Sequence, residues 1–219
     1  AAGRRIYSNI KKAVQYIISI HIPIILTVSM PLFLGWAFPQ IFTPVHVIFL
    51  ELVMGPTCSI VYENEPIEKN TMFQKPRKMT ETFLNINELG ISIVQGLMIT
   101  ACVLLVYQYA VHNGMDERTT RAMVFSNLIF ANIFLSLVNR SFVYSVFQSI
   151  KNKNPLFPLV IGITIALLLL ILYVPVFANF FQLQSLNFQN LAIAVVAASG
   201  AVLWFEIYKW IKYRRSNIK

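Results

Sequence analysis

Six long apolar runs constrain this chain more than any other feature of its sequence. A membrane-spanning helix needs roughly 20 predominantly apolar residues, and the 219 residues contain six stretches of that kind. The chain is 57% hydrophobic and only 12% charged, which indicates an integral membrane protein and not a soluble one. We place the runs at about 14–36, 44–62, 89–111, 121–139, 156–178 and 188–211.

The basic residues predict how these runs are oriented. A net charge of +9 would suit nucleic acid, but the Lys and Arg residues lie at the ends of runs and form no aromatic-interleaved patch. We therefore expect no nucleic-acid partner. With both termini in the cytoplasm, 16 of the 18 basic residues lie on the cytoplasmic side, and only Arg118 and Arg121 lie outside. The positive-inside rule thus predicts two cytoplasmic termini, with some attraction to anionic lipid headgroups.

The predicted fold class is all-α: a polytopic membrane bundle of six transmembrane helices. Residues 14–213 form the transmembrane domain, 214–219 a basic cytoplasmic tail, and 1–13 the start of a cytoplasmic stalk. The stalk is expected because basic and apolar residues alternate there at helical spacing. The residues that carry this pattern are Arg4, Arg5, Lys11 and Lys12 with Ile6, Ile10, Val14 and Ile17. The predicted location is a plasma (inner) membrane.

The second run, within PVHVIFLELVMGPTCSIVYENEP (44–66), is interrupted by a carboxylate and a helix breaker. A carboxylate near the middle of a bilayer costs a few kcal/mol, so Glu51 is expected to face protein or water. Gly55 and Pro56 follow within five residues and weaken the helix, because Pro lacks a backbone donor. Carbonyls freed at such breaks coordinate ions in transporters. The simpler interpretation is a kinked helix with a protonated, hydrogen-bonded Glu51.

Other polar residues within the runs are candidate ligands. His21 precedes Pro23 at mid-depth of the first run, where it is either a hydrogen-bonded packing residue or a proton or cation partner for Glu51. Asn127 and Asn132 lie in the fourth run, and amides in lipid need partners. Hydrogen bonding between helices is favoured for both, with neutral cation ligation as the alternative. The candidate cation ligands are Glu51, Gly55, His21, Asn127 and Asn132.

The connections carry fewer signals. The longest, from Glu63 to Glu88, mixes acids and bases and is typical of a solvated surface, or of a docking site for a cytoplasmic domain. The connection 139–158 is basic and amphipathic and is expected to lie along the membrane interface. Gly90 and Gly96 lie six residues apart, so they do not form a GxxxG motif, but a close helix contact there stays open. Glu206 is expected to pair with Lys209 or Lys212.

The order of motifs resembles a known family. GRRIYSNIKKAVQYIISIHIPIIL is similar to the stalk and fifth membrane helix of P-type ATPases of the calcium-pump type. VHVIFLELVMGPTCSIVYENEP and QKPRK resemble the sixth helix and the loop after it, and LYVPVFANFFQLQSLNFQNLAIAV with WFEIYKWIKYRR resembles the last two helices. The resemblance covers essentially the whole chain. It implies the carboxy-terminal six-helix half of an ATP-driven cation pump.

The chain departs from the calcium-pump pattern at the ion-binding positions. Where the fifth helix of the family supplies an amide and a carboxylate, this chain has His21 and Ile24; on the sixth helix, Asn and then Thr-Asp are replaced by Glu51 and then Met54-Gly55. The acid of the eighth helix matches Ile129. One carboxylate therefore remains, and the resemblance implies calcium or another cation as the transported ion.

The enzymatic parts of the family are not in this sequence. There is no DKTG phosphorylation motif, no nucleotide-binding segment and no actuator loop, so the chain alone is not expected to hydrolyse ATP. The resemblance implies ATP and Mg²⁺ as cofactors of a full-length pump, and no cofactor in this chain. The implied partners are the transported cation, membrane lipids, four further membrane helices, and cytoplasmic phosphorylation, nucleotide and actuator domains. A stand-alone six-helix carrier with a His21–Glu51 proton relay, and a purely structural scaffold, are the alternatives.

Overall fold

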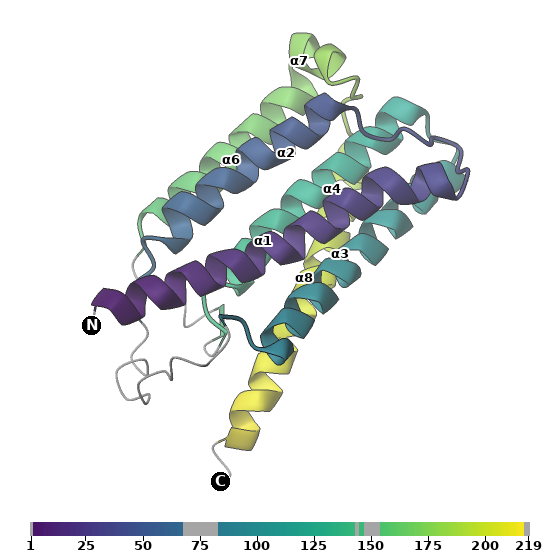
Figure 1. Cartoon of the computed structure of the whole chain (residues 1–219). Helices are drawn as coiled ribbons and strands as arrows, with labels where there is room; N and C mark the ends of the chain where they lie inside the picture. The colour runs from purple at the N-terminus through teal and green to yellow at the C-terminus, as the bar shows by residue number, and fades with distance from the viewer. Residues whose placement is uncertain (1, 68–82, 143–144, 147–153, 217–219) are drawn as a thin grey trace.

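The computed structural model describes residues 2–67, 83–142, 145–146 and 154–216, without the side chains of Cys58 and of residues 212–216. Within these ranges every regular element is a helix. Six helical segments are long and apolar enough to cross a membrane, which confirms the all-α fold class and the number of spans (Figure 1). Six crossings bring both termini to the same end of the bundle, here called the termini end.

The helices follow the apolar runs closely, but their ends are set by local chemistry. They are α1 (Ala2–Phe33), α2 (Pro44–Pro56), the π-helix η1 (Thr57–Tyr62), α3 (Ile86–His112), α4 (Glu117–Val138), α6 (Leu156–Tyr173), α7 (Pro175–Phe180) and α8 (Phe188–Ser216). α1 runs unbroken from the expected stalk into the membrane segment and ends before Gly35, whose φ of 62° suits a helix terminus. α6 stops at Tyr173 instead of 178, because Pro175 starts the separate helix α7.

α4 is the central helix of the bundle. In its most apolar window 78% of the residues are buried, against 28–47% in the other five spans. α4 packs along α8 and α3, α1 packs along α3, and η1 contacts α1 and α6. The five outer helices therefore keep apolar faces free for lipid or for other protein.

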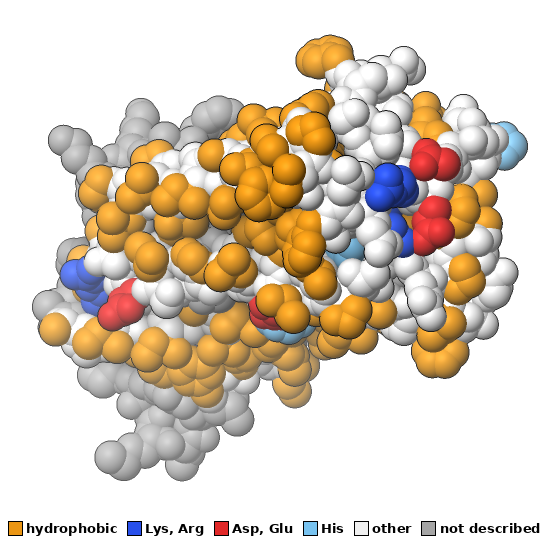
Figure 2. All heavy atoms as spheres, turned by 90° about the horizontal axis from the view of Figure 1, so that it is seen from above, with side chains coloured by type: hydrophobic (Ala, Val, Ile, Leu, Met, Phe, Trp, Pro, Cys, Tyr) orange, Lys and Arg blue, Asp and Glu red, His pale blue; other side chains and the backbone are white. Residues whose placement is uncertain are grey.

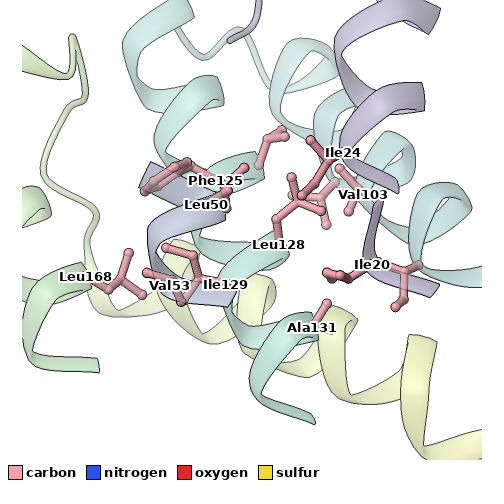
Figure 3. Close-up of a cluster of buried hydrophobic side chains, with 14 of the residues drawn as sticks. Ile20, Ile24, Leu50, Val53, Val103, Phe125, Leu128, Ile129, Ala131 and Leu168 are labelled. Carbon is pink, nitrogen blue, oxygen red and sulfur yellow. The ribbon is translucent and has the colours of Figure 1, made fainter. Parts of the chain in front are cut away.

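The core is built from the facing sides of α1, α2, α3 and α4. Ile20 and Ile24 of α1 approach Leu128 of α4, while Leu50 and Val53 of α2 approach the opposite side of the same helix (Figure 3). Val103 of α3, Phe125, Ile129 and Ala131 of α4 and Leu168 of α6 complete the set labelled there. In α1 and α2 these positions lie three to four residues apart, which is the spacing of one helix face, whereas consecutive residues of α4 are buried because other helices pack on several of its sides.

α1 and α3 approach each other closely at Gly96. A Cβ atom at this position would lie 2.8 Å from the backbone oxygen of Ser19 and 2.8 Å from the Cβ of Ile22. The sequence did not decide whether a close helix contact occurs at Gly90 or Gly96. The structure has it at Gly96, whereas a Cβ at Gly90 would meet nothing within 4 Å. α1 can pack this closely against α3 because Gly96 has no side chain.

Two expectations about the connections need correction. Glu65 belongs to the connection predicted as a solvated surface but is 3% exposed, because four polar side chains converge on it. Arg140, at the start of the connection expected to lie along the interface, is also buried, as are its neighbours Asn139 and Ser141. Residues 68–82 and most of 143–153 lie outside the described residues. The pairing of Glu206 with Lys209 is confirmed, at 2.6 Å.

Candidate ion-binding site

The candidate site centres on two polar side chains from neighbouring helices. Glu51 lies near the middle of the α2–η1 segment and His21 lies in the second half of α1. The Nε2 atom of His21 is 3.2 Å from Oε1 of Glu51, and the two side chains are 39% and 47% exposed. The structure therefore brings together the one carboxylate and the one imidazole that the sequence singles out in these two spans.

The second ring nitrogen of His21, Nδ1, shows which of its ring atoms carries a hydrogen. Nδ1 of His21 lies 2.8 Å from the backbone oxygen of Ile17. A carbonyl oxygen only accepts, so Nδ1 carries a hydrogen. Nε2 of the same ring is then the atom that faces Oε1 of Glu51.

The helix next to Glu51 changes form without unwinding. α2 ends at Pro56, as the sequence predicts, but the chain continues as the π-helix η1 and not as an open break. Pro56 has no N–H, so the carbonyl of Leu52, four residues earlier, loses its helical donor. The N–H of Thr57 bonds to the oxygen of Met54, and the hydroxyl of Ser59 donates to the oxygen of Gly55 at 2.9 Å.

Gly55 lies on the open side of this transition. A Cβ at Gly55 would meet no atom within 4 Å, and Ser59, one turn on, is exposed. Glu51, Gly55 and Ser59 follow at helical spacing and so share one face of the segment. A narrow polar strip with no bulky side chain therefore runs along α2 and η1 beside Glu51.

The other two sequence candidates lie elsewhere. Asn127 is fully buried in α4 and its amide donates to the oxygen of Ala194 in α8 at 2.7 Å. Asn132, also in α4, accepts a hydrogen bond from the hydroxyl of Tyr16 in α1. Both amides thus join helices, which agrees with the interhelical hydrogen bonding favoured from the sequence. The structure does not bring either of them to the His21–Glu51 pair.

The donor set of this chain alone is small for a metal ion. Across the described ranges no three His, Cys, Asp or Glu side chains are grouped closely enough to hold a metal together. A hard divalent cation such as Ca²⁺ takes six to eight oxygen ligands. Glu51 and nearby backbone oxygens would supply part of such a set, so the residues present fit a partial site and not a complete one.

The surroundings of the pair are apolar and uncovered. Along α1 the large side chains of Ile17 and Ile25 are 38% and 61% exposed, and along α2 those of Ile48 and Leu52 are 68% and 63% exposed. Figure 2 shows how few charged side chains interrupt the hydrophobic surface on one face of the molecule. The pair is therefore a polar spot within an apolar face formed by α1 and α2.

Sequence reasoning missed several buried polar residues that organise the bundle. Arg121, which the sequence predicts to lie outside the membrane, is buried within the protein at 3% exposure and donates to the backbone oxygens of Ile41, Gln40 and Gln182. His46 is fully buried at the start of α2, with Nε2 2.7 Å from the oxygen of Phe181. The only signal for either is a polar residue beside an apolar run, which does not distinguish a buried from a solvated residue.

Comparison with known proteins assigns this arrangement to a family. Residues 39–211 match the family described as "Cation transporting ATPase, C-terminus", which accounts for five of the six spans and includes Glu51. The chain belongs to this family. The resemblance to the carboxy-terminal membrane region of P-type cation-transporting ATPases is therefore confirmed, and the six spans agree with it.

Individual relatives match nearly the whole chain. The human "Calcium-transporting ATPase type 2C member 1" is 24% identical over 217 residues, which is 99% of this chain and 23% of that protein. The "Calcium-transporting ATPase 1" proteins of Bacillus cereus and Lactococcus lactis are 25% and 26% identical, each over 96% of this chain and 25% and 24% of their own length. The chain thus spans about a quarter of the length of these relatives.

Proposed function

We propose that this chain forms the ion-translocating half of a longer ATP-driven cation pump, and that Glu51 is its principal ion ligand. The observation that carries the proposal is the contact between His21 and Glu51 beside the α2–η1 transition. This contact brings a carboxyl group and an imidazole together within the membrane segment, close to Pro56, where the helix lacks one backbone donor. Intramembrane ionisable groups mark ion pathways in membrane proteins.

The exposure of the pair supports the presence of further membrane helices. If the chain stood alone in a bilayer, a half-exposed Glu51 would face lipid at a cost of about 2.5–3.5 kcal/mol. The same face carries the exposed Ile25, Ile48 and Leu52, which suits helix contact better than water. We infer that helices preceding this chain in the full-length protein cover the α1–α2 face and contribute the missing ligands.

The proposed partners and cofactors follow from the relatives. These relatives are named calcium-transporting ATPases and are about four times longer than this chain. ATP and Mg²⁺ would act in the cytoplasmic parts of such a protein, and Ca²⁺ is the first ion to test. The proposed location is a plasma (inner) membrane, with the termini end of the bundle in the cytoplasm.

The test is ion-stimulated phosphorylation of the full-length protein in native membranes. Labelled ATP is added with increasing Ca²⁺, and with monovalent and other divalent cations in parallel, and acid-stable phosphate on the protein is measured. We expect Glu51→Gln to raise the half-maximal cation concentration about tenfold to a hundredfold, because a charge-assisted contact contributes about 1.5–3 kcal/mol. Glu63→Gln is the matched control, since Glu63 is an exposed acid beyond the same helical segment.

The two variants separate a site effect from a general charge effect. If Glu51→Gln and Glu63→Gln both leave the cation dependence unchanged, Glu51 is not an ion ligand. If the band recognised by an antibody to this chain has a mass near 25.0 kDa and takes up no phosphate, the pump proposal is wrong. Proton-coupled uptake into liposomes that contain this chain alone would then favour the stand-alone carrier.

A further inference from the structure

The contact between His21 and Glu51 differs from the other carboxylate pairs of this chain in what its second member can bind. Lys and Arg side chains only donate hydrogen bonds and have no lone pair to offer a cation. An imidazole can offer one, and Nε2 of His21 lies 3.2 Å from Oε1 of Glu51. The carboxylates that are paired with Lys or Arg are Glu65, Glu88, Glu117 and Glu206. Among these five pairs, His21 with Glu51 is therefore the one that could hold a cation between its two members.

The backbone of α1 determines which nitrogen of His21 is available. Nδ1 lies 2.8 Å from the oxygen of Ile17, one helical turn earlier, and donates its hydrogen to that oxygen. In a neutral ring the lone pair is then on Nε2, the atom that faces Glu51. Metal-binding histidines show this arrangement, because a hydrogen bond from the other nitrogen to a carbonyl or carboxylate sets the tautomer and the ring orientation. The ring of His21 is therefore oriented as a metal ligand requires.

The histidine of α2 shows the opposite arrangement. Nδ1 of His46 accepts from the N–H of Thr43 at 3.2 Å, and Nε2 donates to the oxygen of Phe181 at 2.7 Å. Both nitrogens of His46 thus bind backbone groups, and the side chain is fully buried. His21 binds the backbone through one nitrogen only and lies on the uncovered α1–α2 face. The two histidines therefore have different roles, and only His21 presents a nitrogen beside a carboxylate.

The separation of the two facing atoms suits a small divalent ion. In zinc sites the metal–nitrogen and metal–oxygen distances are about 2.0–2.2 Å. With both distances at about 2.1 Å, atoms that are 3.2 Å apart subtend an angle of about 100° at the ion. This angle lies between those of octahedral and tetrahedral coordination. His21 and Glu51 can therefore ligate one such ion at their present separation.

The kind of ligand atom indicates the class of ion. Ca²⁺ takes six to eight oxygen ligands, whereas imidazole nitrogen suits Zn²⁺ and the other later first-row divalent ions. A four-coordinate ion would need about two ligands beyond His21 and Glu51. Ca²⁺ would need at least about four more oxygens even with a bidentate Glu51. The two side chains thus complete half of a Zn²⁺ site but a smaller part of a Ca²⁺ site.

We propose that His21 and Glu51 together ligate the transported cation, and that this cation is a divalent ion of the Zn²⁺ and Co²⁺ class instead of Ca²⁺. The inference rests on the proposed function, because it names the ion that the proposed site takes. Glu51 supplies an oxygen that either class of ion uses. His21 supplies a nitrogen that favours one class, so it is the residue that determines specificity. The remaining ligands come from the helices that we infer to cover the α1–α2 face.

The experiment uses the full-length protein in native membranes and labelled ATP. The free cation concentration for half-maximal phosphorylation is measured separately with Zn²⁺, Co²⁺ and Ca²⁺, each held by a metal buffer. We expect the parent to respond to Zn²⁺ and Co²⁺ at concentrations at least about tenfold lower than to Ca²⁺. In His21→Gln an amide oxygen replaces the ligating nitrogen. The half-maximal Zn²⁺ and Co²⁺ concentrations should then rise at least about tenfold, since loss of a hydrogen bond to a ligating histidine already costs about 10–100-fold.

Two further variants make this comparison specific. For Ca²⁺, His21→Gln should stay within about threefold of the parent, because Ca²⁺ accepts amide oxygens. His112→Gln makes the same chemical change at an exposed histidine in the last turn of α3, and it should match the parent with all three ions. His21→Asn keeps an amide N–H that can donate to Ile17 but has no atom at the place of Nε2. It should repeat the loss of Zn²⁺ and Co²⁺ response, and it decides the question if His21→Gln does not accumulate.

A second measurement does not depend on pump activity. The detergent-solubilised full-length protein is dialysed to equilibrium against radioactive Zn²⁺ without ATP, and the bound metal is counted. His21→Gln should lose bound Zn²⁺ that both the parent and His112→Gln retain. If His21→Gln binds as much Zn²⁺ as the parent, the pair is not a metal site and the inference is wrong.

The outcomes separate the inference from the proposed function. If the parent responds to Ca²⁺ at lower concentrations than to Zn²⁺ and Co²⁺, or if His21→Gln shifts all three ions equally, the inference is wrong. The proposed function still stands in that case, provided that Glu51→Gln weakens the response to Ca²⁺. If no cation stimulates phosphorylation of the parent, the proposed function fails, and transport of Zn²⁺ or Co²⁺ fails with it. The dialysis then decides whether His21 and Glu51 still form a metal-binding pair.

Discussion

The contact at Gly96 leads to a prediction with opposite signs for two chemically identical substitutions on one helix. In Gly96→Ala the new methyl group would lie 2.8 Å from both the oxygen of Ser19 and the Cβ of Ile22, so α1 must move away. Such overpacking costs about 1–3 kcal/mol. Replacing Gly by Ala within a helix returns up to about 1 kcal/mol. We therefore expect Gly96→Ala to destabilise the protein by about 1 kcal/mol.

Gly90→Ala is the matched control on the same helix. A Cβ at Gly90 meets nothing within 4 Å, so only the helix propensity changes and the variant should gain up to about 1 kcal/mol. The free energy of unfolding in detergent, measured by denaturant titration with tertiary fluorescence, checks both values. If Gly96→Ala is as stable as Gly90→Ala, the close packing of α1 on α3 does not depend on the missing side chain at residue 96.

Three further substitutions test the buried polar residues, each by unfolding in detergent. Arg121→Met should cost about 1–3 kcal/mol because it leaves buried backbone oxygens without donors, whereas exposed Arg118→Met should stay within about 0.5 kcal/mol; equal effects would contradict the buried role of Arg121. Tyr16→Phe should lower the free energy of unfolding by about 1–3 kcal/mol, because Asn132 loses its donor. An unchanged free energy of unfolding would show that this hydrogen bond does not stabilise the bundle. Asn127→Leu should cost about 0.6–1.7 kcal/mol with the cation dependence of phosphorylation unchanged; a tenfold shift in that dependence would return Asn127 to the ion site.

The spans could be predicted from the sequence because membrane solvation acts on each segment separately. An apolar run of about 20 residues forms a helix in a bilayer whatever its neighbours are, since its backbone bonds are all internal. Helix ends are less predictable: the stop of α6 at Tyr173 depends on Pro175, whose ring suits the first turn of a new helix. The sequence predicts a break where α2 passes into η1, because Pro56 shows that one bond is lost but not how the chain compensates.

Pairing within one helix, as of Glu206 with Lys209, follows from spacing along the chain, whereas pairing between helices was predictable only where depth brings the side chains together. His21 and Glu51 lie at comparable depth in consecutive helices, so their contact follows from two spans packing side by side. The partners of Asn127 and Asn132 are 67 and 116 residues away in the sequence. Nothing in a single sequence determines which of five neighbouring helices a buried amide faces, because that choice depends on the packing of the whole bundle.

The carboxylates of Glu51, in α2, and Glu65, three residues after the end of η1, show the same difference. Glu51 lies in an apolar run and is half exposed, whereas Glu65 lies in a polar loop and is buried. Hydropathy reports depth in the membrane, and depth is independent of burial within the protein. Glu51 lies deep in its span, is half exposed and contacts His21 within this chain, which is why we propose that a further helix or an ion binds beside it. Glu65 lies at the end of the bundle and is buried with Arg140 as its partner, so it joins parts of this chain. Glu51→Gln is therefore expected to change the response to the cation.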